Sequence, residues 1–126
     1  MEWEFFSYDE FACQCGCGSN KMDLVVISEL DAMRRILGFP IVIGSGYRCF
    51  LHPIETAKVV GPGPHSTGLA AGAALSHLRG YRFTELAFQR GFFKGYGFSQ
   101  KGRVRFIHVD ACTAGVGRPR PHIWSY

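Results

Sequence analysis

Glycine and proline divide this chain into short segments, and this division is the strongest constraint on its fold. Sixteen glycines and six prolines occur in 126 residues, gathered between the apolar stretches. Both residue types interrupt regular backbone structure, so the pattern predicts short helices and strands joined by tight turns rather than a helical bundle. The length fits one compact domain, residues 1–126. We therefore expect a single α+β domain.

The composition excludes several classes of function. With 47% hydrophobic residues, the chain has enough apolar material for one core. Its net charge of +4 comes from scattered basic residues, apart from Arg118 and Arg120, so we expect no nucleic-acid partner. No segment resembles a membrane span, and the N-terminus lacks the pattern of a signal peptide. We expect synthesis in the cytoplasm and no membrane partner.

Apolar periodicity predicts two helices. In residues 22–37, apolar side chains recur at steps of three and four residues, and Gly38 and Pro40 follow as stop signals. Residues 83–90 show a second helical face, and Gly91 is well placed to end it. These helices would supply the layers that flank a sheet.

Three regions read as strands. Residues 41–43 are a β-branched run that we expect to be a buried strand, ended by a turn at residues 44–46. Residues 69–75 are small and apolar, which favours a buried strand, although their alanine content also fits a helix. Residues 96–98 and 104–109 are separated by a polar turn, which predicts a hairpin.

The last predicted strand carries a histidine and a carboxylate on one face. Side chains alternate along a strand, so His108 and Asp110 point to the same side. An imidazole can bind zinc through a neutral nitrogen, and a nearby carboxylate can orient the ring or accept a proton. An isolated His-x-Asp pair also fits a plain hydrogen-bonded pair at a strand end.

His65 and Arg48 flank a long connection. Residues 49–64 show no convincing period and are rich in glycine and proline, so we expect a loop lying over a site. Small residues after His65 would let the backbone approach a bound group, and Arg48 can clamp a carboxylate. Taken singly, His65 also fits a loop histidine facing water, and Arg48 a surface arginine packed on Tyr47.

Several short motifs follow one another in a characteristic order. They are Cys13-Gln14-Cys15-Gly16-Cys17-Gly18, Ser45-Gly46-Tyr47-Arg48-Cys49, His65-x-x-Gly68-x-Ala70, His108-Val109-Asp110 and a Trp124-x-Tyr126 ending. In order and spacing this set resembles the zinc D-Ala-D-Ala carboxypeptidase family, whose substrate class is the peptidoglycan stem peptide. The resemblance covers nearly the full chain.

The resemblance implies both a fold and a set of roles. The fold would be a small antiparallel sheet flanked by helices, as in the Hedgehog-like and lysostaphin-like metallopeptidases, with one zinc ion bound by His, Asp and His. His65 and His108 would be metal ligands. Arg48 would bind the substrate carboxylate, and Asp110 would be the general base of the hydrolysis.

The chain departs from the family motif at one ligand position. The motif His-x-x-Gly-x-Ala-x-Asp ends here at Gly72, which has no side chain to bind a metal. A catalytic zinc site usually has three protein ligands and a water, so two histidines alone would hold zinc poorly. Asp110, Glu55, His52 and His122 lie in segments that can approach the site, but we expect loss of the ligand rather than its replacement.

Two functions are compatible with these motifs. One is an active zinc peptidase that cuts peptidoglycan stem peptides, as an endolysin does. The other is a catalytically inactive relative that serves as a wall-binding module, or as a structural part of a phage particle with other phage proteins as partners. Gly72 and the missing export signal favour impaired or lost catalysis. In either case the protein would reach the cell wall after lysis or on a phage particle.

The cysteines leave several possibilities open. The chain contains five, namely Cys13, Cys15, Cys17, Cys49 and Cys112, so at least one stays unpaired if disulfides form. We expect buried free thiols or one bridge to Cys49. A second metal site is an alternative, although alternate-residue spacing is tighter than in the usual zinc knuckles. An iron-sulfur protein is disfavoured because the spacing matches no ferredoxin pattern.

Overall fold

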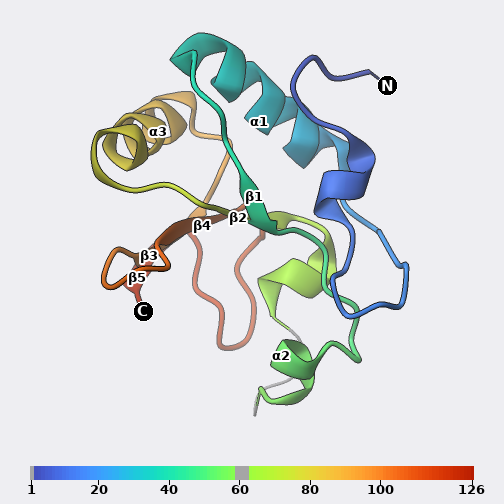
Figure 1. Cartoon of the computed structure of the whole chain (residues 1–126). Helices are drawn as coiled ribbons and strands as arrows, with labels where there is room; N and C mark the ends of the chain where they lie inside the picture. The colour runs from blue at the N-terminus through green and yellow to red at the C-terminus, as the bar shows by residue number, and fades with distance from the viewer. Residues whose placement is uncertain (1, 59–62) are drawn as a thin grey trace.

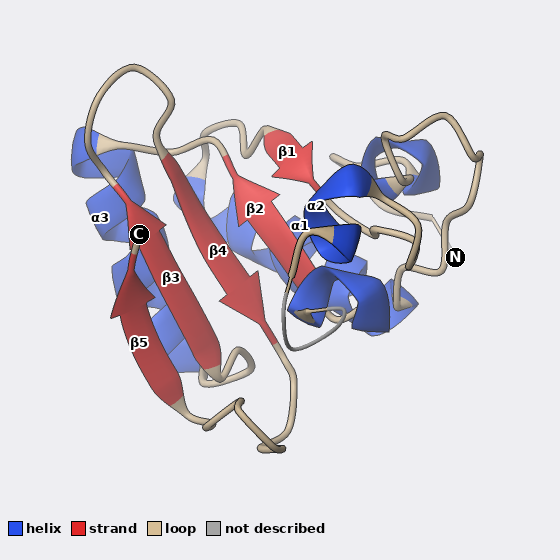
Figure 2. Ribbon diagram, turned by 90° about the horizontal axis from the view of Figure 1, so that it is seen from below, coloured by secondary structure: helices blue, strands red, loops and turns tan. Residues whose placement is uncertain are grey.

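The protein is built around a five-stranded sheet with the strand order β1-β2-β4-β3-β5. The computed structural model describes residues 2–58 and 63–126. The strands are β1 (Ile43–Ser45), β2 (Ala70–Ala73), β3 (Gly95–Ser99), β4 (Phe106–Asp110) and β5 (His122–Ser125). Figure 2 shows them side by side in this order.

Two long helices cover one face of the sheet. They are α1 (Leu24–Leu37) and α3 (His77–Arg90), and Figure 1 shows both on the same side of the strands. The short helix α2 (Pro53–Thr56) lies on the opposite side of the sheet. The chain also forms two short 3-10 helices, η1 (Tyr8–Phe11) and η2 (Pro64–Thr67). The predicted α+β class, a mostly antiparallel sheet flanked by helices, is confirmed.

Local signals set the ends of both long helices. The Asp23 carboxylate accepts a hydrogen bond from the Val25 amide at 2.8 Å, so α1 begins at Leu24, two residues after the predicted start. Gly38 ends α1 with φ 76°, a left-handed conformation that favours glycine. Gly91 ends α3 in the same way, as the sequence predicts. No helix among the described residues is long and apolar enough to cross a membrane.

The hydrophobic core lies between the two long helices and the sheet. The largest side chains that are fully buried there include Phe11, Ile27, Leu30, Met33, Ile41 and Phe83. Each such side chain contributes roughly 1.5–3 kcal/mol of burial free energy. All four residues of β2 are buried. One face of the sheet therefore carries the core, and the other is free to carry a site.

Two predicted segments differ from the structure. The strand predicted at residues 41–43 runs instead from Ile43 to Ser45, because its pairing with β2 joins Ile43 to Ala73 and Ser45 to Gly72. Apolarity alone cannot locate this register. The loop predicted at residues 49–64 contains α2, which begins after His52, and its residues 59–62 lie outside the described part of the chain.

The far edge of the sheet also corrects the prediction. The hairpin of β3 and β4 is confirmed, but β4 begins at Phe106 rather than at residue 104. The resemblance implied an antiparallel sheet, which describes three of the four strand pairings, and β5 pairs with β3 in parallel, from Gly95 with His122 to Phe98 with Ser125. Because β5 has only four residues and three are exposed, it has no apolar alternation by which to recognise it.

Candidate functional site

His108 stands in the middle of β4 between two glycines on the neighbouring strands. In the sheet register it is paired with Gly72 of β2 and with Gly97 of β3. Neither glycine has a side chain to cover the imidazole. The indole of Trp124 fills the space over Gly97, with its ring centroid 5.1 Å from that of His108. On the other side, the Ser45 hydroxyl fills the space over Gly72.

The structure brings the two predicted histidines together. The Nε2 atom of His65 lies 3.2 Å from the Nδ1 atom of His108, and both side chains are buried. Two backbone contacts hold His65 in place. Its Nδ1 atom lies 2.8 Å from the Gly46 carbonyl oxygen, and its own carbonyl accepts a hydrogen bond from the Arg48 amide at 3.1 Å.

The outer ring nitrogens fix the tautomers of the pair. The Gly46 carbonyl can only accept, so His65 donates from Nδ1. The ionised Asp110 carboxylate can also only accept, so His108 donates from Nε2, 2.7 Å from Oδ2. The two inner nitrogens therefore face each other as lone pairs unless one of them is protonated.

This facing geometry suits a shared cation. Two histidine nitrogens on one tetrahedral zinc ion are about 3.3 Å apart, close to the separation of 3.2 Å between His65 and His108. Burial and then the neighbouring His108 lower the pKa of His65 to about 3, so this ring is neutral at pH 7. The pair thus supplies two preoriented nitrogen ligands.

Asp110 orients His108 and is not free to act as a base. Its carboxylate has no exposed surface and accepts hydrogen bonds from His108, from the Cys112 amide and, at 2.8 and 2.7 Å, from two nitrogens of Arg120. Burial alone would raise the pKa of Asp110, but the bonds from His108 and Arg120 outweigh it and hold that pKa well below its usual range. The predicted role as general base does not fit these contacts, because no acceptor position is left for water.

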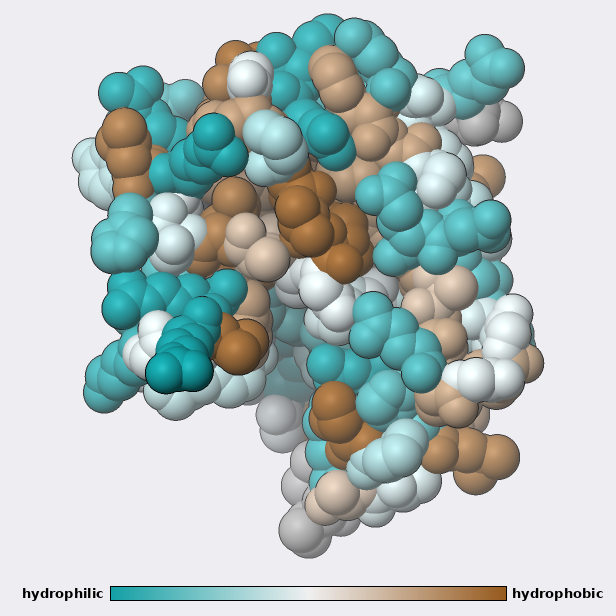
Figure 3. Space-filling view, in the orientation of Figure 1, coloured by the Kyte–Doolittle hydropathy of each residue, from teal (hydrophilic) through white to brown (hydrophobic). Residues whose placement is uncertain are grey.

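A cleft opens beside the histidine pair. Figure 3 shows the surface hollowed below the sheet, between the side of α2 and the side of β3 and β5. The cavity has a volume of about 540 Å³, and its lining includes Arg48, His65, Gly72, His108 and Trp124. The predicted metal and substrate residues thus gather at one cavity, while Asp110 lies behind His108.

One comparison with known protein families finds a match. A family model described as Peptidase M15 matches residues 4–110, which includes both histidines and all of β4. The chain belongs to the peptidase M15 family. This family consists of zinc-dependent peptidases that act on peptidoglycan peptides, so the lineage is that of a peptidoglycan-directed zinc peptidase. No curated protein and no solved structure matches the chain.

In this M15 chain, the residue opposite His108 on β2 is Gly72, which holds no side chain. A Cβ atom at Gly72 would lie 2.6 Å from the Ser45 hydroxyl oxygen, so that hydroxyl occupies the space in which an aspartate side chain would begin. Only rotation of the small Ser45 side chain would be needed to clear it. The histidine pair therefore has two nitrogen ligands and no anionic ligand, which does not fit a three-ligand zinc site.

None of the alternative ligands considered from the sequence replaces it. The His52 side chain caps α2, accepting from the Ile54 amide, and His122 is exposed and stacks on Trp124. Among the described residues, the only group of three or more His, Cys, Asp or Glu ligand atoms close enough to share an ion is a cysteine cluster. We conclude that no described side chain completes the histidine site.

Glu55 is also fully engaged. It accepts hydrogen bonds from Arg48, Lys58, the Gly63 amide and the Ser66 hydroxyl, and it is buried. Burial would raise the pKa of Glu55, but the bond from Gly63 and the Lys58 ammonium lower it to about 2. Glu55 is thus a buried counter-ion. Its Oε2 atom pairs with the Nη1 atom of Arg48 at 3.2 Å.

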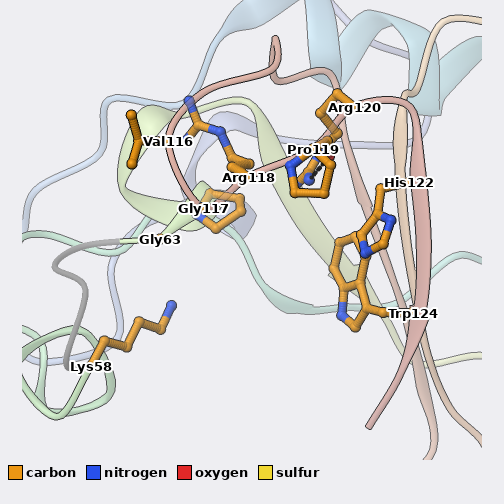
Figure 4. A pocket seen from close by; sticks show the side chains of 10 residues that line it. Lys58, Gly63, Val116, Gly117, Arg118, Pro119, Arg120, His122 and Trp124 are labelled. Carbon is orange, nitrogen blue, oxygen red and sulfur yellow. Dashed lines mark hydrogen bonds between the residues drawn. The ribbon is translucent and has the colours of Figure 1, made fainter.

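A second, basic cavity adjoins the cleft. It has a volume of about 320 Å³ and shares Lys58, Pro64 and Trp124 with the first cavity. Figure 4 shows Lys58 on one side of it and the side chains of residues 116–120 on the other. Lys58 pairs with Glu55, whereas the Arg118 guanidinium donates to the carbonyl oxygen of Thr113. Of the three cationic side chains that line this cavity, Lys58 and Arg120 are each paired with a buried carboxylate.

Three residues shape the site in roles that the sequence did not reveal. Arg120 neutralises Asp110, the Gly46 carbonyl accepts a hydrogen bond from His65, and Ser45 fills the position over Gly72. Arg120 attracted notice only as one of two nearby arginines, and it lies beyond the segment matched by the family model. A partner ten residues away across an irregular loop has no diagnostic spacing.

Proposed function

We propose that this M15 protein binds peptidoglycan stem peptides in its cleft and that its zinc-dependent peptidase activity is impaired or lost. The observation that carries the proposal is Gly72, which lies opposite His108 where an anionic metal ligand would be needed. A neutral two-histidine site gives weak zinc affinity and leaves the charge of the dication uncompensated.

The surrounding carboxylates support this proposal. Hydrolysis by zinc-bound water also needs a base within reach of that water. Asp110 and Glu55 are buried acids near the histidines, and arginine, lysine and amide donors occupy both. The site therefore has neither the third ligand nor an acid free to accept the proton.

Binding does not require catalysis, and Arg48, which lines the cleft, can contribute to it. Its guanidinium has five donors, so the Glu55 contact leaves others for the carboxylate of a stem peptide. We propose that Arg48 binds this carboxylate. Retention of the protein on insoluble peptidoglycan, compared with an Arg48→Gln variant, tests the assignment, and equal retention would refute it.

Restoring the ligand tests the proposed loss of activity. We expect the wild-type protein to show no turnover of a D-Ala-D-Ala peptide, and a Gly72→Asp variant to bind one more zinc ion per chain than the wild type. Its turnover should be measurable but slow, because Asp110 and Glu55 stay engaged with their donors. Gly72→Asn is the matched control, because it brings nearly the same bulk against Ser45 without the negative charge. Zinc is measured by elemental analysis and turnover by release of D-alanine.

Two results would overturn this proposal. Turnover by the wild-type protein would show that the two histidines suffice or that another group completes the site. Equal zinc contents and rates in the Gly72→Asp and Gly72→Asn variants would show that the missing carboxylate is not the cause of inactivity.

The same missing ligand favours a second candidate function, in which the domain is a non-catalytic wall-binding component, such as one carried on a phage particle. This candidate requires binding to intact peptidoglycan with no cleavage even at high protein concentration. Tight binding to intact sacculi with no soluble fragments released would favour it, and absence of binding would eliminate it.

A further inference from the structure

Four cysteines from two separate segments meet beside the start of the sheet. Cys13, Cys15 and Cys17 follow η1, and Cys49 follows β1. Their four sulfur atoms all lie within 4.8 Å of one another, with Cys13 to Cys15 at 3.4 Å and Cys15 to Cys49 at 3.5 Å. None of the four is in a disulfide. The prediction of buried free thiols holds for Cys13 and for the fifth cysteine, Cys112, whereas Cys15 and Cys17 are exposed and Cys49 is half-buried.

The backbone around the cluster is arranged to converge on the sulfur atoms. Gly16 and Gly18 have φ values of 92° and 74°, so the chain turns after Cys15 and again after Cys17 in a conformation that favours glycine. Two amides point at sulfur. The Ser19 amide donates to Cys17 at 3.3 Å, and the Cys49 amide donates to Cys13 at 3.4 Å. Such donors stabilise thiolate charge.

We propose that Cys13, Cys15, Cys17 and Cys49 bind one structural zinc ion through four thiolates. Sulfur ligands of a tetrahedral zinc ion are about 3.8 Å apart, within the span observed here. Thiolates select zinc or iron over hard cations, and a closed four-ligand site leaves no position for substrate. This site is separate from the histidine pair, and the proposal does not depend on that pair's function.

The ion would fix one wall of the cleft. Two residues before the first cysteine of each segment, the Tyr47 amide donates to the Phe11 carbonyl at 2.8 Å, which ties the segment after β1 to the N-terminal segment. The residue before Cys49 is Arg48, whose amide donates to His65. By clamping Cys49 against Cys13, zinc would hold both Arg48 and the backbone support of His65 in place.

Metal analysis of the reduced full-length protein tests this site. We expect about one zinc ion per chain in the wild type, and an intense thiolate-to-metal charge-transfer band when cobalt replaces it. A Cys15→Ser/Cys17→Ser variant should lose both, and its replaced side chains are exposed, so the core is not disturbed. Cys112→Ser is the control, because this fifth cysteine lies outside the cluster.

A further variant separates this site from the histidine pair. His65→Ala/His108→Ala should keep the zinc and the cobalt band, whereas any ion held by the histidines would be lost in this variant and kept in Cys15→Ser/Cys17→Ser. Absence of zinc from reduced wild-type protein would overturn the proposal. So would an unchanged zinc content and cobalt band in the double-serine variant, iron as the native ion, or a stable disulfide to Cys49.

Discussion

The histidine pair and the cysteine cluster both involve residues 44–49, since the Gly46 carbonyl contacts His65 and Cys49 belongs to the cluster. Different contacts hold each of the two groups in place. Around the histidines, Gly46, Asp110 and Arg120 fix both rings through hydrogen bonds and a buried ion pair. Around the cysteines, backbone hydrogen bonds hold the two segments, but the sulfur atoms themselves have two amide donors and weak contacts with one another. One group of ligands is rigid but incomplete, and the other is complete but held loosely.

This difference suggests how a metal site is lost. Ligands that the protein itself orients keep their geometry when one of them is removed, because the outer hydrogen bonds do not depend on the ion. Ligands that depend on the ion would lose their arrangement together with it. The histidine pair is therefore expected to stay in place without zinc, and the cysteine segment is not.

The largest expected effect comes from breaking the support of the histidines. An Arg120→Ala substitution leaves the Asp110 carboxylate, which has no exposed surface, without its charged partner. We expect the free energy of unfolding to fall by about 3–5 kcal/mol. Urea denaturation followed by circular dichroism measures this change, and the zinc content of the cysteine cluster should stay the same while the variant is folded.

Arg90→Ala provides the matched comparison, since Arg90 forms an ion pair with Glu29 at the surface. We expect a loss below about 1 kcal/mol there. Similar losses in both variants would mean that the histidine pair does not depend on a buried ion pair, and the contrast between the two regions would fail.

Low pH should reduce the free energy of unfolding, because Glu55 becomes protonated. The pKa of Glu55 is lowered from 4.5 to about 2, so its contribution to stability is complete above pH 4.5 and is lost as the pH falls toward 2. This change amounts to roughly 3 kcal/mol. The measurement is the difference in unfolding free energy between the wild type and Glu55→Gln across this pH range. A difference that does not change with pH would contradict the assignment.

A third substitution tests the segment that the two regions share. A Cβ atom at Gly46 would lie 2.5 Å from the carbonyl oxygen and 2.6 Å from the Cα atom of Phe11. Backbone must move to admit it, so we expect Gly46→Ala to cost about 1–3 kcal/mol and to speed release of zinc from the cysteines. Gly44→Ala is the control, because its Cβ would meet nothing closer than 3.8 Å. Thermal unfolding and the rate of zinc release are measured for both variants. Equal values for Gly46→Ala and Gly44→Ala would show that residues 44–49 do not support the cysteine cluster.

The sequence predicted the elements that have strong local signals. Helix α1 was recognised by its apolar period and by Gly38, and the β3–β4 hairpin by two apolar runs around a polar turn. Strand β5 was missed because four mostly exposed residues have no period. The register of β1 was missed because it depends on pairing with β2, which local sequence does not encode.

The site was predictable to the extent that its motifs are short and ordered. His65, His108 and Arg48 were found at one cavity because each lies in a motif that fixes its place on the fold. Their partners were not found, because the ion pair of Asp110 with Arg120 joins a strand end to an irregular loop. Roles that depend on a neighbour's charge, such as that of Asp110, cannot be assigned from spacing alone.

The smallest expected effect concerns Ser45. It tests most directly whether the histidine pair is an incomplete metal site. Its hydroxyl lies over Gly72, either as inert filling or as a weak third ligand beside the histidines. A serine hydroxyl is neutral and stays protonated at pH 7, so it compensates no metal charge and we expect it to be filling. Ser45→Ala should then change the unfolding free energy by less than about 0.5 kcal/mol and leave the zinc content unaltered. In the Gly72→Asp background, the same substitution should tighten zinc binding, because it removes the atom that the aspartate Cβ would meet. Loss of bound zinc on replacing Ser45 in the wild type would instead show that the histidine site is complete with a hydroxyl in place of the carboxylate.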